Sequence, residues 1–203
     1  MGRIFDTENW FWRWMGRLPD LFALSFLWLI CCIPVVTWVP SCIALYDSIA
    51  HCIRGSEGGT YRRFFRTLKQ EMKRGIALSV LWLVLALILY CGYNAILAGG
   101  EGNAVSAFSL VYLISMAFPL ATLCWLIPLE SRFSYGFLEL HRTAAIIAFA
   151  HLPSTVLLCG LLWGAATLVY NMPVLMALMP AILVTVQTLV TERVLKKYMP
   201  EEE

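Results

Sequence analysis

Long apolar stretches, separated by short polar connections, dominate this chain. An α-helix needs about 20 mostly apolar residues to cross a bilayer core of about 30 Å, so stretches of that size can be identified along the sequence. The pattern predicts an all-α fold, a polytopic transmembrane bundle of about six membrane segments. These segments are residues 21–39, 41–53, 76–97, 105–129, 143–170 and 174–190.

The first two segments predict a helical hairpin over residues 20–54. Pro34 lacks a backbone donor and disfavours further helix, Thr37 follows it, and Pro40 suits the first turn of a second helix. We therefore expect the chain to reverse at this proline elbow. A helix over residues 41–53 is only about 20 Å long at 1.5 Å per residue, so spanning and re-entrant arrangements both stay open.

Aromatic and basic residues are mixed on both sides of the hairpin. Residues 1–19 combine Trp and Phe with Arg, which is typical of a segment lying at the lipid headgroups. Residues 55–75 predict a cytoplasmic amphipathic helix, capped by Thr60, whose apolar residues recur every four positions. Its predicted docking face, for a protein partner or for anionic lipid, consists of Arg62, Arg63, Phe64, Arg66, Leu68, Lys69, Met72 and Lys73.

Composition favours lipid as the solvent of this chain. With 60% hydrophobic residues, 14% charged residues and a mean hydropathy of +0.74, its 203 residues carry more apolar surface than a soluble domain can bury. Basic and aromatic residues also occur in nucleic-acid-binding proteins. Beside so many apolar segments, we expect a lipid bilayer and no nucleic acid as partner.

The placement of positive charge predicts the topology. With a hairpin over residues 20–54, both termini are cytoplasmic and all 15 Lys and Arg residues lie on the cytoplasmic side. If that stretch crosses only once, there are five segments, and Arg3, Arg13 and Arg17 lie outside. The positive-inside rule favours the hairpin. We expect a single membrane domain over residues 1–203, with four further transmembrane helices in residues 76–192 and a cytoplasmic tail over residues 193–203.

Ionisable groups at membrane depth are candidate functional residues because they are costly there. Asp47 and His51 lie four residues apart, hence on one helix face, with Tyr46 adjacent. Such a set could relay a proton, bind a cation or contact a polar ligand, or Asp47 could simply pair within the bundle. Elsewhere, Glu130 and Arg132 are close enough in sequence to form a surface ion pair at a helix end.

Signatures of enzymes are absent from the sequence. It contains no HExxH helix, no GxSxG elbow and no Walker A loop. The seven cysteines all fall within apolar runs and form no CxxC pair, which is typical of small apolar packing residues. We therefore expect no catalytic, cofactor-binding or metal-binding residues.

One part of the sequence resembles a known family. The run DLFALSFLWLICCIPVVTWVPSCIALYDSI, followed by YRRFFRTLKQEMKRG and an apolar helix, is similar to the YesL-like bacterial integral membrane proteins, a family defined by a domain of unknown function. The resemblance is strongest over residues 5–95. It implies a multi-pass protein of the bacterial plasma membrane, often encoded beside carbohydrate ABC importers and their sensor kinases.

These observations together predict a non-enzymatic membrane protein that is accessory to carbohydrate uptake or its sensing, with importer or sensor kinase components as partners. The alternative is a small transporter or channel with Asp47 and His51 in its path. A third possibility is an intramembrane enzyme of an unrecognised kind.

Overall fold

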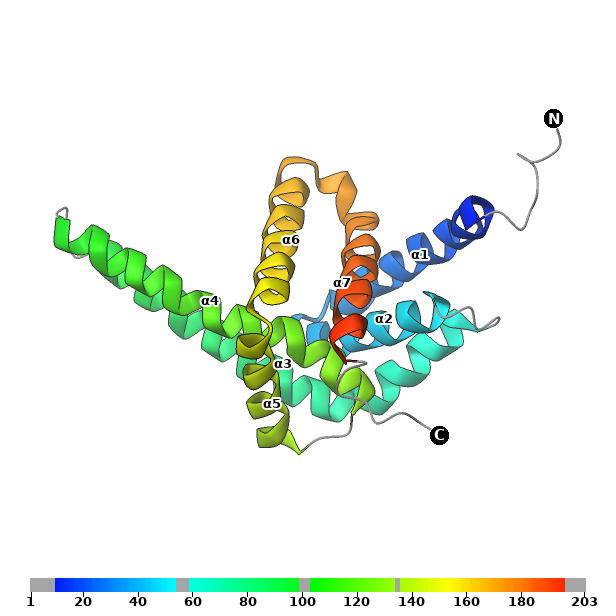
Figure 1. The fold of residues 1–203 in the computed structure, drawn as a ribbon, viewed down its shortest axis with the longest axis horizontal. Helices are drawn as coiled ribbons and strands as arrows, with labels where there is room; N and C mark the ends of the chain where they lie inside the picture. The colour runs from blue at the N-terminus through cyan, green and yellow to red at the C-terminus, as the bar shows by residue number, and fades with distance from the viewer. Residues whose placement is uncertain (1–9, 54–58, 99–102, 134–135, 196–203) are drawn as a thin grey trace.

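The computed structural model describes residues 10–53, 59–98, 103–133 and 136–195, and these form seven α-helices, two short 3₁₀ helices and no strand (Figure 1). The predicted all-α class is thus confirmed for the described part of the chain. The elements are α1 Trp10–Cys32, η1 Val35–Thr37, α2 Trp38–Ile53, α3 Thr60–Ala98, α4 Asn103–Arg132, α5 Phe137–Ala150, α6 Leu152–Asn171, η2 Pro173–Ala177 and α7 Met179–Leu195.

The proline elbow joins α1 to α2, which pack against each other. The Thr37 hydroxyl donates to the carbonyl oxygens of Cys31 and Pro34, while Ser41 Oγ donates to Thr37 O at 2.7 Å. The bond to Cys31 O satisfies a carbonyl group that the end of α1 leaves without a helical partner. Toward the N-terminus, α1 continues through Pro19, so no helix ends between the predicted segments 1–19 and 20–54.

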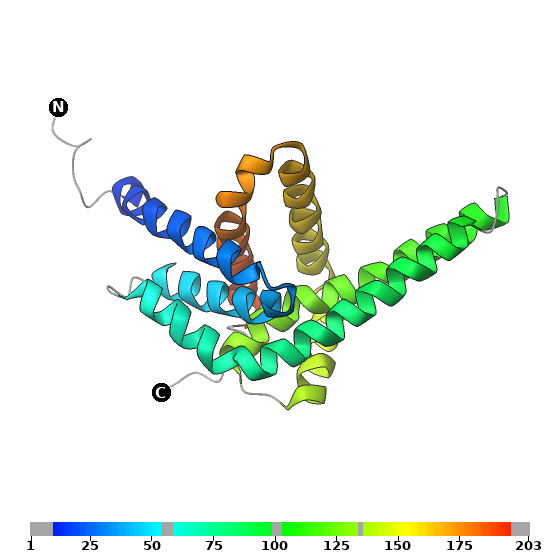
Figure 2. The ribbon, with the colours of Figure 1, turned by 180° about the vertical axis from the view of Figure 1, so that it is seen from behind.

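A single helix, α3, covers both the predicted amphipathic helix and the next apolar segment. Its ribbon changes direction between the basic first part and the apolar second part (Figures 1 and 2). Gly75, where two separate helices were expected to meet, lies inside α3 against the start of α2: a Cβ there would lie 2.7 Å from Pro40 Cβ. The structure thus joins the two predicted segments in one helix, in which this glycine allows close packing against α2.

The second part of α3 and the first part of α4 run side by side and project from the rest of the protein (Figures 1 and 2). Tyr112 of α4 donates its hydroxyl proton to Leu89 O at 2.9 Å, and Gly92 leaves room for that hydroxyl. Further along the chain, α5 ends and α6 begins at His151, next to Pro153.

Two apolar clusters form the core, and α2 contributes to both. One cluster joins α2 to α3, α4 and α5 around Trp125, which is completely buried. The other joins α2 to α1, α3 and α7 around Tyr46 and Phe64, which are also completely buried. As a result, α2 is enclosed by other helices along most of its length.

By contrast, two helices expose most of their apolar surface. The helix spanning Thr60–Ile96 and the helix Leu152–Asn171 are long and apolar enough to cross a membrane, with mean hydropathies of 2.4 and 1.8 in their most apolar 18-residue windows. Only 22% and 11% of these windows are buried. Apolar surface exposed in this way is compatible with contact to lipid or to another protein.

Candidate functional site

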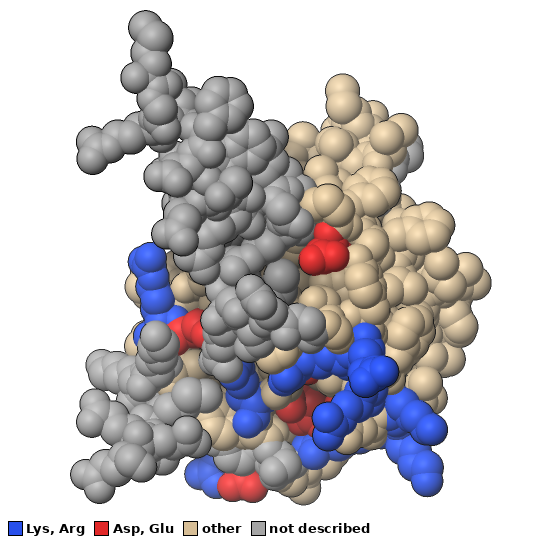
Figure 3. Space-filling model, turned by 90° about the vertical axis from the view of Figure 1, so that its right-hand side faces the viewer, with Lys and Arg blue, Asp and Glu red and all other residues tan. Residues whose placement is uncertain are grey.

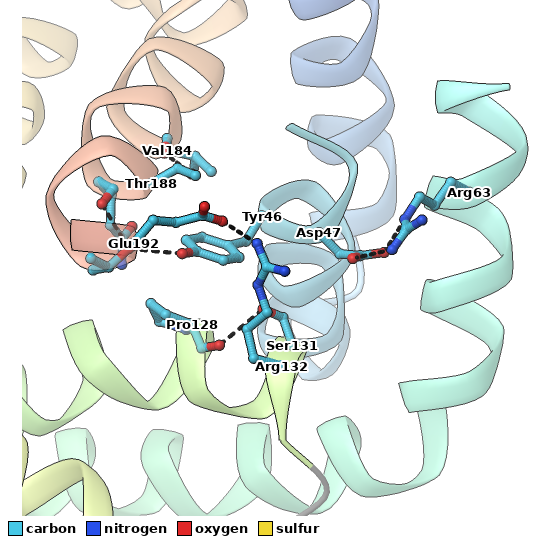
Figure 4. Close-up of polar contacts among 11 residues, drawn as sticks. Tyr46, Asp47, Arg63, Pro128, Ser131, Arg132, Val184, Thr188 and Glu192 are labelled. Carbon is cyan, nitrogen blue, oxygen red and sulfur yellow. Dashed lines mark hydrogen bonds and ion pairs between the residues drawn. The ribbon is translucent and has the colours of Figure 1, made fainter. Parts of the chain in front are cut away.

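Six polar residues from four helices lie around α2, and this group is here called the polar layer (Figure 4). Tyr46 and Asp47 are neighbours on α2, and Figure 4 shows them pointing to opposite sides of that helix. The layer consists of Tyr46 and Asp47 of α2, Arg63 of α3, Arg132 of α4, and Thr191 and Glu192 of α7.

The Asp47 carboxylate accepts three hydrogen bonds from α3. Arg63 donates from Nε to Oδ2 and from Nη2 to Oδ1, both at 2.8 Å, and Thr67 Oγ1 donates to Oδ2 at 2.8 Å. This is the bidentate geometry that makes an Arg–carboxylate pair strong. No hydrogen bond joins Asp47 to His51 within the described residues; His51 is half-buried in the last turn of α2. The geometry therefore makes Asp47 a link between α2 and α3.

Tyr46 links α2 to α7 inside the core. Its hydroxyl lies 2.7 Å from Thr191 Oγ1, which in turn donates to Gln187 O at 2.8 Å. Since the Thr191 proton is used there, Tyr46 is the donor to Thr191. The series of hydrogen bonds extends to α4, because the side-chain amide of Gln187 donates to Cys124 O at 2.9 Å. Tyr46 and Gln187 are thus both satisfied by hydrogen bonds between helices.

The predicted ion pair between Glu130 and Arg132 is replaced by two pairs with residues far along the chain. Arg132 pairs with Glu192 of α7, whereas Glu130 contacts Arg74 Nε of α3 at 2.7 Å. The two residues are separated because Glu130 turns inward, with its side chain only 2% exposed. Burial raises the pKa of the Glu130 carboxyl to about 7; Arg74 opposes this increase and Glu71 adds to it.

The structure divides the predicted docking face into an inner and an outer side. Phe64 and Leu68 are buried and Met72 is half-buried against the same apolar cluster, so the apolar side of this helix docks onto the protein itself. Arg63 is engaged by Asp47. The four residues of the predicted face that remain outward and exposed are Arg62, Arg66, Lys69 and Lys73. Lys and Arg side chains gather on the lower part of the face shown in Figure 3.

Two hollows on the protein are almost entirely apolar. One, of about 400 Å³, lies between α3, α4 and α5 beside Trp82 and Phe118, and the other, of about 430 Å³, lies between α6 and α7 beside Gly160 and Gly164. Asp47 lines neither. Within the described residues, no three His, Cys, Asp or Glu side chains are grouped so that they could hold a metal ion.

Comparison with known proteins identifies one domain. No curated protein and no solved structure matches the chain. Residues 21–93 match the family model described as a protein of unknown function, DUF624. The matched residues comprise most of α1, the elbow, α2 and most of α3, and they include Tyr46, Asp47 and Arg63 of the polar layer. A DUF624 domain is therefore found at residues 21–93.

Proposed function

We propose that this chain is a non-enzymatic integral membrane protein of the bacterial plasma membrane, accessory to carbohydrate uptake or its sensing. The observation that carries the membrane placement is the exposure of α6 and of the apolar part of α3. Leu87, Ile88 and Tyr90 of α3 are 63%, 61% and 63% exposed, and Trp163 of α6 is 74% exposed. Apolar surface of this extent is stable only when lipid or another protein covers it.

The proposed topology has six membrane segments with both termini in the cytoplasm. In it, the turn between α6 and α7 lies outside, and the basic part of α3 lies inside. Membrane-impermeant thiol labelling of a cysteine-free variant tests this arrangement, with a single cysteine introduced by Asn171→Cys or Lys69→Cys, both at exposed positions. Labelling of intact cells should modify the former only; the reverse result would overturn the topology.

The accessory role rests on the resemblance to YesL-like proteins and on the way in which the polar layer is used. Its ionic groups face one another across helix interfaces, so they hold helices together rather than present a reactive group. Recognition of a partner would then fall to the exposed surfaces. ABC importer subunits and sensor kinases are the partners that the resemblance implies.

Co-purification tests this role. The protein, tagged and produced at its native level, should bring down a carbohydrate importer subunit or a sensor kinase from mild-detergent extracts. A matched preparation from cells carrying an unrelated tagged membrane protein is the control. Repeated failure to recover either class of partner, with the protein itself intact, would refute the accessory role.

The transporter alternative needs Asp47 to be available to an ion or substrate. Three hydrogen bonds from α3 occupy that carboxylate, which supports the accessory role over transport. Flux into proteoliposomes is the discriminating measurement. Uptake of a sugar or cation that is lost with Asp47→Asn and kept with a substitution at the exposed Gln70 would overturn our preference.

A further inference from the structure

Four exposed cations form one continuous line along the first part of α3, here called the basic stripe: Arg62, Arg66, Lys69 and Lys73. Their spacing of four, three and four residues places them on a single helix face. Among the described residues, none of the four forms an ion pair, whereas the neighbouring Arg63 and Arg74 both do. The positive charge of the stripe is therefore not neutralised by the described residues of this chain.

Like charges repel at these spacings and cost the helix stability. The opposite face of α3 is held by Phe64 and Leu68 in the core, so the stripe faces outward and the repulsion among its charges remains. An external anionic surface would relieve it. Two aromatic side chains, Tyr61 and Phe65, are 40% and 50% exposed beside the stripe, and aromatic rings favour the boundary between water and lipid.

The helix itself determines how far the stripe lies from lipid. Because α3 is continuous, Lys73 lies about 5 Å along the axis from Ile76, where the apolar part begins, and Arg62 lies about 21 Å from it at 1.5 Å per residue. The helix α3 changes direction along its length (Figure 2), so the basic stripe and the apolar part do not lie on one straight line. Lys73 is close enough to contact headgroup phosphates, and the other three long side chains reach them when the first part of α3 lies along the membrane surface.

From this geometry we propose that the basic stripe binds the phosphate groups of anionic phospholipids in the leaflet that α3 enters. The inference rests on the proposed membrane placement of α3. Each cation near an anionic membrane surface strengthens binding about 5-fold, equivalent to about 1 kcal/mol. A lipid surface, rather than a protein, is favoured because the apolar part of the same helix brings that surface beside the stripe.

Lipid retention by the full-length protein tests the proposal. The protein is equilibrated in neutral detergent with equal amounts of phosphatidylglycerol and phosphatidylcholine, and the lipids that remain bound after purification are quantified by mass spectrometry at low and high salt. The wild type should retain more phosphatidylglycerol at low salt and lose this preference at high salt. The double substitution R62Q/R66Q should reduce the preference by up to about 30-fold.

Two variants serve as controls. R142Q/R193Q also removes two exposed cations, but from α5 and α7, and should reduce the lipid preference much less than R62Q/R66Q does. R62K/R66K keeps the charge and should retain the preference. All variants should keep the wild-type circular dichroism spectrum, because the replaced side chains are exposed.

The outcomes separate this proposal from the membrane placement on which it rests. Equal retention of the two lipids by the wild type, or an unchanged preference in R62Q/R66Q, would overturn lipid binding. If R62Q/R66Q instead lost an importer subunit or a kinase while keeping its lipids, the stripe would be a protein-docking surface. Release of the wild type from membranes by alkaline carbonate would instead refute the integral membrane placement.

Discussion

Replacing Glu130 by glutamine should make the stability of the protein much less dependent on pH. The Glu130 side chain is 2% exposed, and its pKa is raised to about 7 by burial. A carboxyl group with a higher pKa in the folded chain binds its proton more tightly there than in the unfolded chain. The wild type should therefore be most stable at acidic pH and lose stability as the pH rises from about 4.5 through about 7.

The size of this effect follows from the same values. A rise in the pKa of Glu130 from 4.5 to about 7 corresponds to at most about 3 kcal/mol of stability lost at alkaline pH. For a chain of this length, that amounts to roughly 6–12 °C in melting temperature. The glutamine amide carries no charge at any pH, so the Glu130→Gln variant should match the wild type at pH 5 and melt at a higher temperature at pH 8.

Thermal unfolding in detergent micelles at constant ionic strength, from pH 5 to pH 8, measures this difference. Glu139→Gln is the matched control, because that side chain is exposed and its replacement should leave the pH dependence as in the wild type. Parallel melting curves for the wild type and Glu130→Gln over this range would refute the reasoning. So would a Glu130→Gln variant that is destabilised equally at both ends, since that result would assign the dominant role to the pair with Arg74.

Substitutions at three other contacts are tested by thermal unfolding at neutral pH. Tyr46→Phe removes a buried hydrogen bond between α2 and α7 and should cost about 1–3 kcal/mol; a loss below about 0.3 kcal/mol would contradict that bond. Asp47→Asn should cost about 1 kcal/mol, and a double-mutant cycle with Arg63→Gln should show coupling between the two sites. Gly75→Ala should lower the free energy of unfolding by about 1–3 kcal/mol, because the added methyl group clashes with α2. As a control, Gly164→Ala places its methyl group in open space and should be neutral or stabilise by up to about 1 kcal/mol. Equal effects of the two substitutions would be inconsistent with the packing at Gly75.

The sequence predicted the helical class and several of the places where the chain turns, because prolines and the periodicity of apolar residues act locally. The end of α1 shortly before Pro34 is an example. The continuity of α3 was missed for a different reason. The composition changes abruptly at Gly75, and a glycine at such a change is typical of a helix end. Only the packing of Pro40 on that glycine shows why the helix continues instead.

Local spacing was a poor guide to the ionic contacts. Asp47 and His51 lie one helical turn apart, yet Asp47 binds Arg63, and Glu130 and Arg132 each pair with a residue on another helix. Choice of partner depends on which faces of α2, α3, α4 and α7 meet, and a single sequence does not encode that in its spacing. The recurrence of apolar residues every four positions did predict one apolar side of α3, but Phe64 and Leu68 of that side are buried within the protein rather than free to dock on a partner.

The enclosed position of α2 has a consequence for biosynthesis. Tyr46 finds its partner 145 residues later in the chain, and Ser25 of α1 accepts a hydrogen bond from the backbone of Ala181, 156 residues later. Both contacts form only after α7 has left the ribosome. The α1–α2 hairpin must therefore remain incompletely packed until α7 has been synthesised. A DUF624 stretch cut off after residue 93 would lack these contacts, so its maturation depends on a helix outside its own boundaries.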